Sequence, residues 1–244
     1  GMLSHSSHKE VYGLKILHVH QIAHIPQLLV RELRVRGMRA NFVEKANEDI
    51  ICQHDIVHGH YALNRNTIEA FRIARRNNIP FILHCHGSDL RLLTGTKRVG
   101  LPFHYRIISN YIRNRSSRIL LSTPDLIEFE PRGTYIPNPV DLDFFRPMPE
   151  IEKVPQHLIM GKLIRGSSIL EHIDPEKEYH CVNTGQRIEW PPNVRQLDFV
   201  PYERLPEFFN RYEFMLGTFG DLISMARLEA MACGLDTFTN FEER

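Results

Sequence analysis

Short apolar runs alternate with longer amphipathic stretches along the first half of the chain. The runs predict strands at residues 14–20, 39–43, 55–61, 80–86, 118–122 and 134–136. Apolar positions at helical spacing predict helices at 25–37, 66–77 and 104–115. Strands that alternate with helices favour a parallel sheet with crossover helices, so this half predicts a Rossmann-like α/β domain.

A second alternation begins near residue 157, after a proline-rich connection formed by Pro147, Pro149 and Pro155. Strands are predicted at 157–163, 178–182, 194–200, 214–219 and 236–240, and helices at 205–212 and 221–234. Closely spaced prolines stiffen a linker. The pattern therefore predicts two α/β domains, at residues 1–147 and 148–244.

The last predicted helix carries an unexpected carboxylate. Asp221 is suited to cap its start, and Gly234 is suited to the left-handed position at its end. The predicted apolar face consists of Met225, Leu228, Met231 and Ala232. Glu229 lies among these residues, where an unpaired charge is costly. Two interpretations stay open: a capped amphipathic helix that tolerates one Glu, or a ligand site at a strand–loop–helix turn of the kind that aims a helix at phosphate.

Three predicted strands end in a His-x-His pair. The pairs are His18/His20, His58/His60 and His84/His86. Residues i and i+2 of a strand share a face, and the carboxyl ends of parallel strands line a ligand crevice, so up to six imidazoles converge. The cluster could hold a metal, donate hydrogen bonds to a sugar or phosphate, or consist of half-buried histidines bonded to backbone. We expect no metal, because no carboxylate is spaced to complete a hydrolase motif.

Composition indicates an ordinary globular chain with an uneven charge distribution. The 244 residues are 42% hydrophobic and 24% charged. Residues 1–147 carry a net charge of +7 and the remainder −6, which suggests different partners for the two domains. No apolar run approaches the ~20 residues that span a bilayer. The four scattered cysteines predict free thiols, and together these features predict a cytoplasmic protein without a nucleic-acid partner.

The segment between Asp89 and Asp125 contains no acidic residue. Its seven cations are Arg91, Lys97, Arg98, Arg106, Arg113, Arg115 and Arg118. Apolar residues lie between them, a combination that suits an anionic membrane surface. We therefore predict peripheral membrane contact through residues 91–118. The alternative is a helix that packs on the sheet while its cations are merely solvated.

Four motifs resemble those of family 4 glycosyltransferases of the GT-B fold. Asp221-x7-Glu229, followed by Ala-Met-Ala-Cys-Gly, resembles the Glu-x7-Glu signature, with Asp for the first Glu. The segment 135–147 resembles the Ile-Pro-Asn-Gly-Val-Asp motif that ends the first domain. The stretch 161–166 resembles the Gly-Arg-Leu…Lys-Gly loop, and His86-Gly-Ser-Asp89 resembles the element after the fourth strand. The Gly-Gly loop after the first strand is replaced by residues 20–24, which contain no glycine.

The resemblance implies two Rossmann-like domains facing each other across a cleft, the second shortened. It implies a retaining glycosyltransferase that moves a sugar from a UDP-, GDP- or ADP-linked donor to an acceptor hydroxyl, without metal or cofactor. Cell-surface polysaccharide or glycolipid synthesis at the inner face of the membrane is the expected setting. The implied catalytic residues are His86 and Asp221. The implied donor-binding residues are Lys162, Arg165, Glu229, Ser224, Gly161, Gly185 and Asn138. The implied acceptor-side residues are His20, His60, Ser88 and Asp89.

Two alternatives come from other functional classes. A catalytically weak member would bind a nucleotide sugar or a partner protein, and a metal-dependent hydrolase would use the His-x-His pairs. The nucleotide base, the sugar, the acceptor and a possible homo-oligomer stay open.

Overall fold

The computed structural model describes residues 13–94, 103–160, 169–182, 189–217 and 224–238. The chain forms two compact units, unit 1 at residues 1–139 and unit 2 at residues 140–244. The boundary thus falls after Pro139, where the sequence analysis places it after Pro147.

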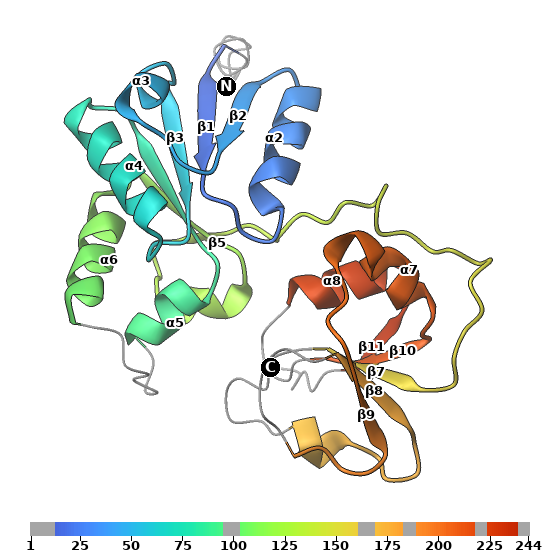
Figure 1. Ribbon diagram of the computed structural model, residues 1–244. Helices are drawn as coiled ribbons and strands as arrows, with labels where there is room; N and C mark the ends of the chain where they lie inside the picture. The colour runs from blue at the N-terminus through green and yellow to red at the C-terminus, as the bar shows by residue number, and fades with distance from the viewer. Residues whose placement is uncertain (1–12, 95–102, 161–168, 183–188, 218–223, 239–244) are drawn as a thin grey trace, which may run out of the picture. The chain divides into compact units, whose positions relative to one another are not determined.

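Unit 1 is built on a six-stranded parallel sheet (Figure 1). Its strands are β1 Lys15–Val19, β2 Arg39–Val43, β3 Ile56–His60, β4 Phe81–Cys85, β5 Arg118–Leu121 and β6 Thr134–Tyr135. Their spatial order is β2-β1-β3-β4-β5-β6, and every neighbouring pair is parallel. The predicted α/β class and the predicted strands are confirmed.

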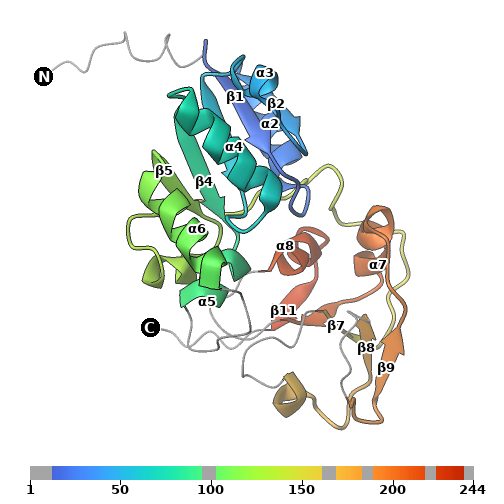
Figure 2. The same cartoon turned by 60° about the vertical axis from the view of Figure 1, so that its left-hand side comes forward.

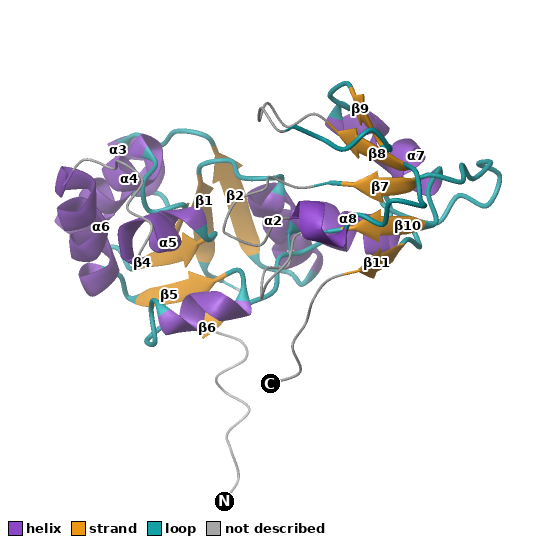
Figure 3. Cartoon of the chain, turned by 90° about the horizontal axis from the view of Figure 1, so that it is seen from below, coloured by secondary structure: helices purple, strands orange, loops and turns teal. Residues whose placement is uncertain are grey.

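Helices cover both faces of this sheet. They are α2 Ile25–Val35, α3 Glu48–Ile51, α4 Arg65–Arg76, α5 Ser88–Thr94 and α6 Phe103–Arg115. Figure 3 shows α2 on one side of the sheet and α3, α4 and α6 on the other. Sequence analysis missed α3 and α5, because four and seven residues are too short to show helical periodicity.

The apolar core of unit 1 lies on one face of its sheet. Leu17, Val57 and Leu83 are fully buried there with Phe71 and Ala74 of α4. The alternate strand positions, which face the other way, carry the histidines. Gly59 separates two of them, and a Cβ there would lie 2.4 Å from the ring of Phe81, so only glycine fits.

Unit 2 contains a five-stranded parallel sheet (Figure 2). Its strands are β7 His157–Ile159, β8 Tyr179–Val182, β9 Val194–Leu197, β10 Phe214–Leu216 and β11 Asp236–Phe238. Their order is β11-β10-β7-β8-β9. The helices α7 Leu205–Asn210 and α8 Met225–Ala232 pack against each other. Short 3-10 turns occur at Pro124–Glu128 in unit 1 and at Ile169–His172 and Tyr202–Arg204 in unit 2.

Two details of α8 differ from the sequence prediction. Ser224 caps the helix by accepting a bond from the backbone N–H of Arg227, whereas Asp221 lies outside the described residues. The buried face contains Glu229 and Ala230, and Met231 is 49% exposed. Arg227 is buried as well, and Ala232 packs against the unit 2 core, so the predicted apolar face is wrong at Met231. The left-handed glycine at the helix end is confirmed by Gly234, whose φ is 87°.

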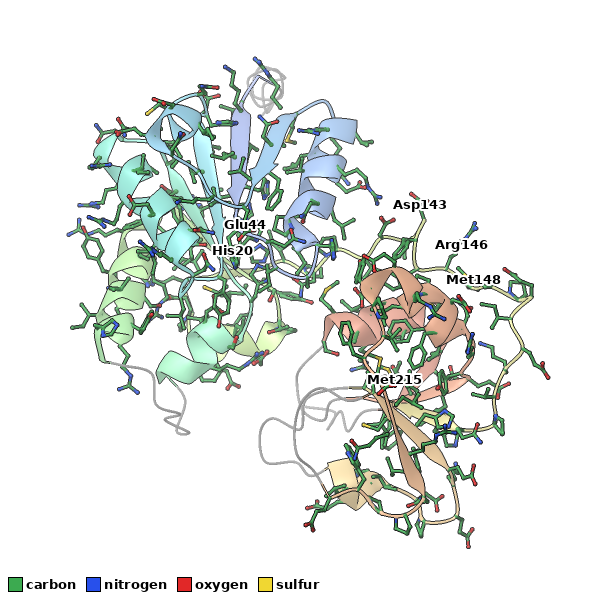
Figure 4. The ribbon with its side chains drawn as sticks, in the orientation of Figure 1. His20, Glu44, Asp143, Arg146, Met148 and Met215 are labelled. Carbon is green, nitrogen blue, oxygen red and sulfur yellow. The ribbon has the colours of Figure 1, made fainter. Side chains whose placement is uncertain are left out.

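The proline-rich connection is fastened to unit 2. The side-chain amide of Asn210 accepts a hydrogen bond from the backbone N–H of Met148 at 2.7 Å and donates one to the backbone carbonyl of Arg146 at 2.9 Å. Figure 4 labels Met148 and Arg146. Phe145 is 1% exposed and belongs to the same apolar cluster as Phe209. Phe145 is thus part of the unit 2 core, and the backbone of residues 146–148 is hydrogen-bonded to unit 2 rather than forming a free spacer.

A buried ion pair in unit 1 connects α6 to the segment that precedes β6. Arg113 of α6 donates to Glu130 at 3.0 Å, and both side chains are under 10% exposed. Arg132 donates two further bonds to the same carboxylate, at 2.7 and 2.9 Å. Although burial opposes ionisation, the bonds from these two cations hold the pKa of Glu130 below its usual value.

We predict that Glu130→Ala lowers the free energy of unfolding by about 3–5 kcal/mol, because it leaves the Arg113 charge buried and unpaired. The matched control is Glu69→Ala, which breaks the exposed Glu69–Arg72 pair and should cost under about 1 kcal/mol. Urea unfolding of both variants makes the measurement. Equal losses for the two would contradict the prediction.

Candidate functional site

Each sheet contains a topological switch point, where the strand order reverses. In unit 1 it lies between β1 and β3, and in unit 2 between β7 and β10. Ligands of open parallel sheets bind outside the carboxyl ends of the strands at such points. Among the sequence-predicted residues, His20 follows β1 and Ser224 follows β10, whereas Ser88 and Asp89 follow β4, the neighbour of β3.

The loops at the unit 1 switch point adopt left-handed backbone conformations without glycine. After β1, His20, Ala23 and His24 have φ values of 75°, 46° and 59°, and after β3 Tyr61 has a φ of 64°. Such conformations are costly for residues with a Cβ and persist where surrounding structure enforces them. Residues 20–24 thus reach glycine-like geometry with bulkier side chains.

His20 is held by a carboxylate that the sequence analysis missed. Its Nδ1 lies 2.8 Å from Oε1 of Glu44, and the backbone N–H of Gln21 donates to Oε2 at 2.8 Å. Figure 4 shows His20 and Glu44 side by side at the ends of β1 and β2. Burial opposes ionisation of Glu44, yet these bonds lower its pKa. An acidic residue directly after a predicted strand was the available signal.

The other five predicted histidines converge, as the strand spacing predicts. Nδ1 of His18 lies 3.1 Å from Nε2 of His60, whose Nδ1 lies 3.0 Å from Nε2 of His86. His58 stacks on His60 and His84 lies tilted against it, with ring centroids 4.4 and 5.3 Å from that of His60. These bonds join imidazole to imidazole, so the alternative of histidines bonded to backbone does not describe them.

Burial keeps these imidazoles neutral. It lowers the pKa of His18 to about 4 and that of His86 to about 3. Burial and then the neighbouring rings lower the pKa of His58, His60 and His84 well below the usual value. Neutral imidazoles donate one hydrogen bond, accept another and can ligate a metal.

Asp89 organises the loops around the cluster. Its carboxylate accepts from the backbone N–H groups of Ala62, His86 and Gly87 at 3.0, 3.0 and 2.9 Å, and its side chain is fully buried. Burial raises its pKa, while these bonds act in the opposite direction. Ser88 beside it lies 3.1 Å from the hydroxyl of Tyr61. Asp89 therefore fixes the loops after β3 and β4 relative to each other.

Glu229 is the buried carboxylate of unit 2. It is 4% exposed on α8, and burial raises its pKa to about 7. Burial, followed by the charges of Glu229 and Asp141, raises the pKa of Tyr202 to about 12, which places the Tyr202 phenol within electrostatic reach of this carboxylate. No sequence pattern singles out Tyr202, because it lies in none of the motifs.

Several predicted residues lie elsewhere. Asn138 belongs to unit 1, and its buried Oδ1 has no partner among the described residues. The predicted residues outside the described parts of the chain are Gly161, Lys162, Arg165, Gly185 and Asp221. Two cations of the basic segment are engaged internally: Arg91 with Asp125 at 2.5 Å, and Arg113 with Glu130. The solvated-cation alternative is therefore wrong for these two. None of the described helices is long and apolar enough to cross a bilayer.

We predict that Asp89→Ala lowers the free energy of unfolding by about 3 kcal/mol or more, because it leaves buried backbone N–H groups without an acceptor. Asp49→Ala, at the exposed start of α3, is the control and should cost under about 1 kcal/mol. Hydrogen exchange should show Ala62 and Gly87 losing protection in the Asp89 variant. Unchanged protection would contradict the role of Asp89 in fixing the loops.

Comparison with known proteins bears on the fold. No protein-family model and no curated protein matches the sequence. Among solved structures, the wall teichoic acid polymerase TagF aligns over 93% of this chain and 70% of its own, with 11% identity and a TM-score of 0.52. MurG of Acinetobacter baumannii aligns over 92% and 85%, with 8% identity and a TM-score of 0.44. SnogD of Streptomyces nogalater aligns over 93% and 84%, with 14% identity and a TM-score of 0.35. On the likeness to TagF, the chain has the two-sheet α/β fold of the GT-B glycosyltransferases.

Proposed function

We propose that the protein is a retaining glycosyltransferase, which moves a sugar from a nucleoside-diphosphate sugar to an acceptor hydroxyl. The observation that carries the proposal is Glu229. It is a buried carboxylate with a raised pKa, on the helix that follows the switch-point strand β10. Perturbed carboxylates at a ligand crevice mark functional sites. The GT-B fold supports the same reaction class.

In this proposal unit 2 binds the donor. Glu229 accepts hydrogen bonds from the ribose hydroxyls, and Ser224 fixes the start of α8 by capping it. Gly161, Lys162 and Arg165 follow β7 in the sequence, and Asp221 follows β10, the two strands that flank the switch point. Gly185 follows the neighbouring strand β8. The two cations would stabilise the charge that develops on the departing diphosphate, and Asp221 would contact the sugar.

Unit 1 contributes the acceptor side. We assign to His86, which ends the imidazole chain, the catalytic role that the family resemblance implies, and to His20, His60 and Ser88 the acceptor-side roles. Asp89 acts as a positioning residue, because its carboxylate is occupied by three backbone N–H groups. Asn138, whose buried Oδ1 has no partner among the described residues, is assigned to donor binding although it belongs to unit 1.

The transfer as proposed requires no metal, because cationic side chains replace the ion at the diphosphate. The metal-dependent hydrolase is not favoured, since the groups of potential metal ligands in the described residues contain no carboxylate to act as a general base. A catalytically weak, nucleotide-sugar-binding protein would pass the binding tests below. Release of free nucleotide from a sugar donor in the presence of acceptor separates it from an active transferase.

We predict that Glu229→Gln weakens binding of the matching nucleoside diphosphate by about 1–3 kcal/mol, the cost of losing a charged hydrogen bond. Calorimetry with UDP, GDP and ADP makes the measurement. Glu207→Gln, an exposed carboxylate paired with Arg211, is the control and should bind as the wild type does. An unchanged affinity in the Glu229 variant would remove the ribose role.

Nucleotide affinity should also depend on pH through Glu229. Because burial raises the pKa of Glu229 to about 7, the carboxylate form is in the minority below that pH and dominates above it. If only the ionised form binds the ribose, affinity should rise about tenfold from pH 6 to pH 8. Titration of the phosphates is common to wild type and Glu229→Gln, so the difference between their pH profiles isolates the carboxylate. Parallel profiles would contradict the assignment.

We further propose peripheral contact with an acidic membrane, through residues 91–118, for a lipid-linked or cell-surface acceptor. On α6, Ile107 and Tyr111 are 55% and 47% exposed, beside the exposed Arg115. Lys97→Glu plus Arg98→Glu should abolish co-sedimentation with phosphatidylserine vesicles at low salt, since each cation contributes about 1 kcal/mol. Arg39→Glu plus Lys45→Glu is the charge-matched control on unit 1. Equal loss in both pairs would indicate unspecific attraction.

A further inference from the structure

The histidine cluster of unit 1 is more than the proposed transfer requires. Four of its imidazoles, those of His18, His58, His60 and His84, are at most 6% exposed. Buried nitrogens without a hydrogen bond destabilise a fold, so a fold retains them where a ligand or a neighbouring group satisfies them. Both nitrogens of His84, Nε2 of His18 and of His58, and Nδ1 of His86 have no partner among the described residues.

The spacing of these nitrogens suits a metal ion. Two overlapping triads, His18/His58/His60 and His60/His84/His86, each offer ligand atoms that lie within 4.8 Å of one another. In a tetrahedral site with metal–nitrogen bonds of about 2.0–2.1 Å, ligand atoms lie about 3.3 Å apart. Nδ1 of His60 and Nε2 of His86 are already 3.0 Å apart, so small ring rotations would bring a triad to this geometry.

Two observations favour the second triad. The residues of the first are all buried, whereas His86 of the second is only partly buried, beside Gly87 at the end of β4, which gives an ion a route of entry. In addition, a ligating imidazole usually holds its other nitrogen in a hydrogen bond. When Nδ1 of His60 faces the ion, its Nε2 remains bonded to Nδ1 of His18 at 3.1 Å.

We propose that His60, His84 and His86 bind one borderline first-row transition-metal ion of the Zn²⁺ type, with His18 orienting His60. All-nitrogen ligands of this kind suit Zn²⁺, Ni²⁺ or Cu²⁺ rather than Mg²⁺ or Ca²⁺, which take oxygen ligands. The ion ties the carboxyl ends of β3 and β4 together. It belongs to unit 1, whereas the cations proposed to hold the diphosphate belong to unit 2.

The test uses the full chain after chelator treatment and dialysis. Equilibrium dialysis should show one tightly held Zn²⁺ per chain, and Co²⁺ should give the intense visible absorption of a four-coordinate ion. Zn²⁺ should also raise Tm, because it binds the folded state alone. His60→Asn and His84→Asn should each weaken binding at least about tenfold. His58→Asn, from the other triad, and His104→Asn, on the exposed face of α6, should retain the ion.

Several outcomes would overturn the proposal. No saturable equivalent would mean that the cluster is an imidazole hydrogen-bond chain. Binding that persists in His60→Asn and His84→Asn would mean that surface histidines hold the ion. Loss in His58→Asn with retention in His84→Asn would move the ion to the other triad. Should the His60 and His84 variants fail to fold, His86→Asn, whose side chain is the least buried of the three, provides the same test.

Discussion

The alternation of side chains along β1, β3 and β4 is the constraint on which unit 1 depends. The side chains on one face of these strands, Leu17, Val57 and Leu83, pack against α4. The alternate side chains point to the opposite face, where the imidazoles of adjacent strands lie next to one another. A one-residue slip of any strand would exchange the two sets and bury histidines in the apolar core. The apolar core therefore fixes the strand register, and the register in turn fixes the imidazole contacts. Packing on one face thus determines chemistry on the other.

The ends of the strands need a second device, because alternation does not extend into loops. Asp89 supplies it by accepting backbone N–H groups from the loops after β3 and β4. Glu44 does the same after β1, through His20 and Gln21. Both carboxylates act on backbone or on a neighbouring ring within unit 1. Left-handed conformations at His20 and Tyr61 are maintained beside them, so the loops there are held by polar contacts rather than by glycine.

The sequence predicts the regular parts of this structure because hydrophobic periodicity reports burial directly. The strands of both units and the convergence of the histidines follow from periods of two and from parallel connections. Contacts between residues distant in sequence leave no such pattern, which explains why Glu44 and Tyr202 were missed. One position of the α8 face was mispredicted, because hydrophobicity favoured burial of Met231, which is 49% exposed. Helix α5 was missed because seven residues show too little periodicity.

Burial shifts the pKa values of buried groups in the two units in opposite directions, yet both shifts have the same effect on charge. It lowers the pKa of His18 to about 4 and raises the pKa of Glu229 to about 7, and in each case it favours the neutral form. The two kinds of buried group differ, however, in the ligand that compensates for their lost hydration. A neutral imidazole presents a nitrogen lone pair, which suits a borderline metal ion, while a carboxylate presents oxygens that accept from hydroxyl groups. Both units share the parallel-sheet architecture, so the fold does not distinguish their ligands. The ligand that suits each unit therefore depends on the hydrogen-bond donors and acceptors of its buried side chains.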